Sequence, residues 1–154
     1  MLKLSLEKGN RKAASPLAGI LLKYSRNVTN MTKVLSMIEK GIGLNDPAAM
    51  TLYTEIMTSQ QIKDPYIFHH AMKYLHKAAG TGYPPAIYIL AVFTYYGLHG
   101  IPRSNTKGFQ LFSKAAAKLY LPAMLSAAEQ LIGGDGVVED CSDAISMLKR
   151  IIDV

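Results

Sequence analysis

The sequence predicts an all-α fold, a right-handed α-solenoid in which about three to four pairs of antiparallel helices stack on one another. One observation is that residues 84–117 have the pattern of a helix, a tight glycine turn and a second helix. Such a helix pair is too small to bury its apolar faces alone. The other is that the chain matches itself when shifted by 37 residues, as Ala49, Ala86 and Ala123 show. A period in this range with two helices per unit is typical of α-solenoids.

The same period recurs in the second helices and in the turns. The second helices align at four small or apolar positions, Val34, Ala71, Gly108 and Ala144. In the turns, Gly97 and Gly100 match Gly134 and Gly136. We therefore expect one repeat array over residues 1–154, with units at 13–44 (degenerate), 45–82 (irregular), 83–119 (best matching) and 120–154 (last).

Local signals place the individual helices within these units. Helices are expected over residues 16–24, 32–40, 47–58, 66–79, 84–96, 107–117 and 122–132, followed by a last helix that reaches 152. Proline opens several of them, and it suits the first turn of a helix because its missing N–H is not needed there. Asp46 precedes Pro47 as a cap, Ser104 can cap the helix at 107–117, and either Asp140 or Ser142 can cap the last helix.

The best-matching unit also follows a known pattern. The residues that carry the pattern are Ala86, Leu90, Ala91, Gly97, Gly100, Ile101, Ser104, Lys107, Gly108, Leu111, Phe112, Lys114, Ala115 and Ala116. This pattern resembles the Sel1-like repeat, a relative of the tetratricopeptide repeat with a longer period. The resemblance covers roughly residues 13–154, is strong from Ala71 onward, and departs at Thr94, where the family usually has an aromatic residue.

The resemblance implies a groove that is lined by the first helix of each unit. Carrying the register of related helical repeats onto this chain gives the candidate groove residues Tyr24, Thr51, Glu55, Tyr88, Val92, Tyr95, Leu125 and Glu129. Tyr88, Val92 and Tyr95 share one helical face. Tyrosine suits an interface because it buries a large area and keeps a polar end. The alternative is that part of this stripe belongs to the core.

For function, the resemblance implies a non-enzymatic scaffold or adaptor that binds a partner protein or peptide and helps to assemble or stabilise a multi-protein complex. The alternatives are a mitochondrial complex-assembly factor and an RNA-associated helical-repeat protein. The net charge of +6 suits RNA, but the expected groove carries Glu55 and Glu129 without lysine or arginine, which argues against nucleic acid. We expect the protein to contact a membrane only through a partner protein.

The sequence contains no pattern of catalytic residues, and we expect neither a cofactor nor a metal. His69, His70 and His76 lack the i, i+3 or i, i+4 spacing that places two imidazoles on one helical face. Cys141 is the only cysteine and has no nearby histidine in the sequence. The longest apolar run, at 86–96, is shorter than the roughly 20 residues needed to span a bilayer.

The last helix is apolar on the face that a further repeat would cover. A longer parent chain, a partner or a second copy of this chain could cover it. We expect an intracellular protein, and the sequence does not specify its compartment. The mitochondrion is the runner-up because Lys3, Lys8, Arg11 and Lys12 make the N-terminal segment basic.

Overall fold

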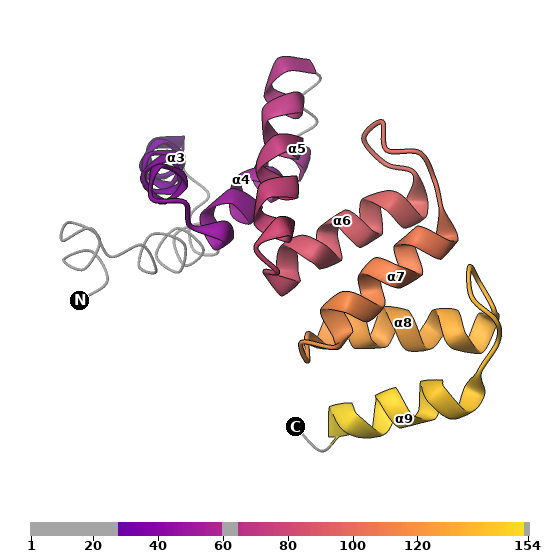
Figure 1. Ribbon diagram of the computed structural model, residues 1–154. Coiled ribbons are helices and arrows are strands. Elements are labelled where there is room, and N and C mark those ends of the chain that lie inside the picture. Colours follow the sequence, from indigo (N-terminus) through magenta and orange to yellow (C-terminus); the bar gives the residue numbers. More distant parts are fainter. Residues whose placement is uncertain (1–27, 60–64, 153–154) are drawn as a thin grey trace. The chain divides into compact units, whose positions relative to one another are not determined.

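The computed structural model describes residues 28–59 and 65–152, and every element in this part of the chain is helical (Figure 1). The helices are α3 (Val28–Gly43), α4 (Pro47–Ser59), α5 (Pro65–Gly80), α6 (Pro84–Tyr96), α7 (Asn105–Ala116), α8 (Leu121–Gly133) and α9 (Cys141–Ile152). The predicted all-α class is therefore confirmed. The helix expected at 16–24, and Tyr24 with it, lie outside the described residues.

The chain divides into two compact units, an N-terminal unit, Met1–Thr81, and a C-terminal unit, Gly82–Val154. The division falls within one residue of a predicted repeat boundary. The described helices α3 to α5 belong to the N-terminal unit, and α6 to α9 belong to the C-terminal unit.

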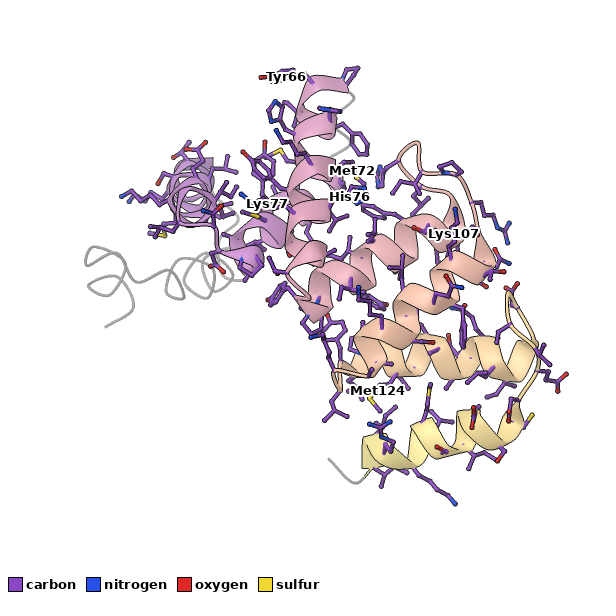
Figure 2. All side chains as sticks on the ribbon, viewed as in Figure 1. Tyr66, Met72, His76, Lys77, Lys107 and Met124 are labelled. Carbon is purple, nitrogen blue, oxygen red and sulfur yellow. The ribbon has the colours of Figure 1, made fainter. Side chains whose placement is uncertain are left out.

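In the N-terminal unit, apolar residues of α3 pack against α4. Val34 and Ile38 are fully buried there against Ile56. Between α4 and α5 the contact includes a hydrogen bond, because the hydroxyl of Thr54 donates to the carbonyl of Ala71 at 2.9 Å. At the N-terminal end of α4, the ammonium of Lys77 on α5 donates to the side chain of Asn45 (Figure 2).

The end of α3 differs from the expectation. The sequence predicts a helix over residues 32–40 that is ended by Gly41 and Gly43, but α3 includes both glycines. The residue that turns the chain is Asn45, whose φ of 57° is left-handed. Asparagine tolerates this conformation better than most side chains and can stand in for a C-terminal glycine.

In the C-terminal unit, α6 with α7 and α8 with α9 form two antiparallel pairs (Figure 1). Gly108 of α7 lies so close to α6 that an added Cβ would be 2.8 Å from the Cβ of Tyr95. Met124 of α8, which Figure 2 labels, is buried and lines a small hollow together with Met147 of α9. The aligned residues Ala86, Ala123, Gly108 and Ala144 are all buried, so small side chains allow the helices to approach closely.

The two turns of this unit repeat the same hydrogen bonds. Gly97 and Gly134 end α6 and α8 with left-handed φ values of 68° and 63°, which glycine adopts without a steric cost. The amide of Ser104 then donates back to Thr94, and the amide of Asp140 donates back to Leu131, each at 2.9 Å. The turn alignment predicted from the sequence is thus present in the backbone.

Both second helices of the C-terminal unit start with a side-chain cap. The hydroxyl of Ser104 accepts from the amide of Lys107, as the sequence predicts. At the start of α9, the cap is Asp140, whose carboxylate accepts from the amide of Asp143 at 2.9 Å. Because Ser104 caps α7, this helix begins at Asn105, two residues earlier than expected.

Candidate functional site

A hollow of about 490 Å³ opens in the C-terminal unit. Its lining residues come from α6, α7, α8 and the loop after α8, and we call it the tyrosine hollow. They are Tyr88, Val92, Tyr95, Tyr96, Phe112, Ser126, Glu129, Gln130, Gly133 and Asp135. The volume lies in the range of roughly 300–1,000 Å³ that is typical of ligand pockets.

Helix α6 supplies one wall of the tyrosine hollow. Tyr88, Val92 and Tyr95, three of the candidate groove residues, follow one another at i, i+4 and i+7 and all line the hollow. The ring of Tyr88 packs at 5.6 Å from Phe112 of α7 and at 5.5 Å from Tyr120, measured between ring centroids. The ring of Tyr88 therefore packs against other aromatic rings of the unit and also lines the hollow.

A hydrogen-bond network joins Tyr95 to the loop after α8. The hydroxyl of Tyr95 and the side-chain amide of Asn105 each donate to the carboxylate of Asp135. The hydrogen bond to Asp135 raises the pKa of Tyr95 to about 12, with burial and the negative charge of Asp135 adding to it. The same two hydrogen bonds, from Tyr95 first and then Asn105, lower the pKa of Asp135.

This network gives Tyr95 a second task. Its hydroxyl links the first helix pair of the unit to the turn of the second pair, while its ring lines the hollow. Asp135 lies between Gly134 and Gly136 in the turn after α8, and the sequence pattern does not predict its hydrogen bond with Tyr95, 40 residues away. The tight packing of Gly136 against Asn105, where an added Cβ would overlap the backbone at 2.4 Å, fixes the loop in this position.

The tyrosine hollow is acidic. Glu129 and Asp135 line it, and none of its lining residues is lysine or arginine. Glu129 lies exposed on α8, and the described residues give its carboxylate no hydrogen bond or ion pair. Beside it, Gln130 is 6% exposed, and its side-chain oxygen is buried without a donor among the described residues.

The remaining candidate groove residues lie elsewhere. Leu125 is exposed on α8 but does not line the tyrosine hollow. Glu55 is on the exposed side of α4, and desolvation raises the pKa of its carboxyl. Thr51 differs from the expectation, because it is only 3% exposed and its hydroxyl donates to the carbonyl of Pro47 at 2.7 Å. Thr51 therefore offers no free group to a partner.

The N-terminal unit contains a second hollow, of about 420 Å³, which the groove register did not identify. It is lined by Glu39, Ile42, Gly43, Tyr53, Tyr66, His70 and Tyr74. Tyr53 and Tyr74 meet edge to face, with ring centroids 5.5 Å apart. Desolvation is the main reason why the pKa of Tyr53 is raised.

The histidines and the cysteine form no metal centre in the described part of the chain. No group of three His, Cys, Asp or Glu side chains is arranged there to hold an ion. The rings of His69 and His70 meet edge to face, with centroids 6.3 Å apart, and Cys141 is an exposed thiol.

The last helix keeps an apolar face open. Ile145 and Ile152 of α9 are 52% and 84% exposed. Across residues 28–59 and 65–152, no helix combines the length and the apolar character that crossing a membrane requires.

Helix pairs joined by these capped glycine turns, at a spacing of about 37 residues, define an α-solenoid of the tetratricopeptide-related kind. The sequence pattern of the Sel1 repeat family matches residues 68–82 and 84–118. These two segments therefore carry the Sel1 repeat pattern, as the sequence analysis predicts for this part of the chain. A comparison with curated proteins finds no match.

Solved structures share the fold at low sequence identity. A Sel1 repeat protein from Oxalobacter formigenes is 21% identical, with a TM-score of 0.67, and the match covers 77% of this chain and 89% of that one. Cysteine rich protein B of Helicobacter pylori is 20% identical, with a TM-score of 0.60 and coverage of 83% and 91%.

A protective antigen of uropathogenic Escherichia coli strains, which displays an SLR fold, is also similar. It is 21% identical, with a TM-score of 0.76 over 99% of this chain. The match covers only 32% of the antigen. These likenesses support the solenoid fold of the chain.

Proposed function

We propose that this protein is a non-enzymatic scaffold that binds a segment of a partner protein in the tyrosine hollow. The observation that carries the proposal is the hollow itself, which is lined by tyrosines of α6, by Glu129 of α8 and by Asp135 of the loop after α8. Sel1 repeats generally serve as protein-interaction modules, and this hollow uses side chains from both helix pairs of the C-terminal unit.

The composition of the hollow favours a protein partner over RNA. Tyrosines enriched at a partly buried surface are typical of protein interfaces. Single-stranded RNA requires cations along its backbone, whereas the charged lining residues here are Glu129 and Asp135. A role in assembling or stabilising a larger complex follows if the scaffold holds one partner in this hollow and another on the open face of α9.

Affinity capture tests the proposal. The tagged chain is recovered from the cells that produce it, with and without RNase, and its partners are quantified by mass spectrometry. The wild type is compared with Glu129→Lys, which reverses a charge inside the hollow, and with Glu139→Lys, which makes the same change at an exposed site outside the lining.

We expect a protein partner that survives RNase, is retained by Glu139→Lys and is reduced at least tenfold by Glu129→Lys. Recovery that is equal for both variants would contradict the assignment of the hollow. Partners that disappear with RNase would favour the RNA-associated alternative. Circular dichroism of both variants checks that the helices are intact.

A further inference from the structure

The chemistry of the tyrosine hollow specifies more than a generic partner. Aromatic rings from Tyr88, Tyr95, Tyr96 and Phe112 make up much of its lining. Such faces accept the apolar stem of a long side chain, and their negative π-surface attracts a cation. An occupant with an aliphatic stem and a cationic head would therefore match the rings.

The carboxylates supply the complementary charge. Glu129 is not neutralised by any cation among the lining residues, and the described part of the chain gives it no ion pair. Asp135 receives hydrogen bonds from Tyr95 and Asn105, which hold it in its ionised form and fix its position. The positive charge of Arg103, which lies outside the lining, also lowers the pKa of Asp135. An anionic segment would be repelled from this hollow.

A buried acceptor adds a third requirement. The side-chain oxygen of Gln130, a lining residue that is 6% exposed, lacks a donor among the described residues. Buried polar atoms are usually paired, so an occupant that carries several N–H donors suits this lining better than one that carries none. A trimethylated lysine has a cationic head but no N–H donor, so it does not meet this requirement.

Arginine meets all three requirements better than lysine. Its guanidinium is planar, stacks on aromatic rings and carries five donors in a fixed fork, so one head group can serve several acceptors at once. The ammonium of lysine is a compact and strongly hydrated charge that stacks poorly.

We propose that the tyrosine hollow binds an arginine side chain of the partner, held between the rings of α6 and the Glu129 carboxylate. This assignment rests on the proposed scaffold function, and it names the residue of the partner that anchors the complex. The partner's recognition segment is then expected to be basic rather than acidic.

The test uses N-acetyl-arginine methylamide as the probe and N-acetyl-citrulline methylamide as its neutral, nearly isosteric counterpart. Both are titrated into the full ¹⁵N-labelled chain, and binding is followed by amide chemical shifts. We expect saturable shifts at Glu129, Gln130 and Asp135 with the arginine compound, and at least tenfold weaker binding of the citrulline compound. Raising the salt concentration should weaken the arginine binding because the attraction is electrostatic.

Two matched variants localise the binding. Glu129→Gln should weaken the arginine compound at least threefold, whereas Glu139→Gln, an exposed carboxylate outside the lining, should leave its affinity unchanged. The proposal is overturned if the arginine compound causes no shifts at these lining residues, or if the citrulline compound binds equally well. The capture experiment uses no arginine compound. A partner that is lost from Glu129→Lys together with a failed titration would therefore refute the arginine anchor and leave the scaffold function standing.

Discussion

At the residue scale, Tyr95 carries two tasks that a sequence pattern cannot separate. Its ring belongs to the predicted groove stripe, while its hydroxyl holds Asp135 in the following turn. Replacing Tyr95 by alanine would therefore damage the packing of the unit and the hollow together. A change that removes only the hydroxyl separates the two tasks.

Tyr95→Phe is expected to raise the pKa of Asp135 toward the ordinary value of 3.8, because the hydrogen bond from Tyr95 is the first cause of its depression. A carboxyl with a depressed pKa in the folded state contributes stability above its unfolded pKa, and this contribution is lost as the pH falls through the folded pKa. The wild type should therefore exceed Tyr95→Phe in stability at neutral pH, with the difference disappearing in acid.

Carbon-detected NMR titration of the Asp135 carboxyl measures this effect directly. Tyr96→Phe is the control, since Tyr96 lines the same hollow but does not bond to Asp135. An Asp135 pKa that is identical in the wild type and in Tyr95→Phe would show that the hydrogen bond is absent in solution.

The approach of α6 and α7 gives a second prediction. An added Cβ at Gly108 would lie 2.8 Å from Tyr95 Cβ and 3.1 Å from Tyr95 Cα, so the helices would have to separate. Gly108→Ala should therefore destabilise the protein by about 1–3 kcal/mol, although alanine is the better helix former. Gly133→Ala is the matched control, since nothing lies within 4 Å of its added Cβ.

Urea unfolding of both variants provides the measurement. We expect a lower midpoint for Gly108→Ala and an unchanged or higher midpoint for Gly133→Ala. Equal midpoints for the two variants would mean that the helices are less closely packed than described here.

At the scale of the element, each second helix depends on the residue before it. The sequence offers either Asp140 or Ser142 as the cap of α9, and in the structure the carboxylate of Asp140 accepts from the amide of Asp143. Asp140 is equivalent to Ser104, which caps α7 in the same way. The repeat therefore preserves the role of the cap while its side chain changes.

Asp140→Ala should cost about 1 kcal/mol of stability, within the usual range of about 0.5–2 kcal/mol for the loss of an N-cap. Ser142→Ala should cost less, because the structure gives the capping role to Asp140. Thermal unfolding of the two variants side by side tests the assignment, and a larger effect of Ser142→Ala would reverse it.

At the scale of the whole molecule, much of the fold could be predicted because it depends on small residues at a fixed period. Ala49, Ala86 and Ala123 must be small for neighbouring helices to meet, and each is fully buried. The left-handed turns at Gly97 and Gly134 are equally easy to predict, because each requires a glycine that is visible in the sequence. The helix ends were less predictable, since Asn45 turns the chain where the sequence indicates Gly41 and Gly43.

The candidate site was only partly predictable, for a physical reason. Helical periodicity states which residues of α6 share a face, so Tyr88 and Val92 could be placed together. It does not state how deeply a position is covered, which is why Thr51 was expected in the groove and is buried. A contact between a helix and a distant turn, such as that of Tyr95 with Asp135, produces no periodic pattern in the sequence.

The central claim is that a partner protein occupies the tyrosine hollow, and site-specific photo-crosslinking tests it most directly. A benzophenone amino acid replaces Tyr96, which lines the hollow and is 62% exposed, or Ile145, which is 52% exposed on the open face of α9. After irradiation in the producing cells, the account predicts that a partner is joined to the chain at position 96 and that the hollow variant Glu129→Lys abolishes this product. A partner that is joined at position 145 and never at position 96 would contradict the account.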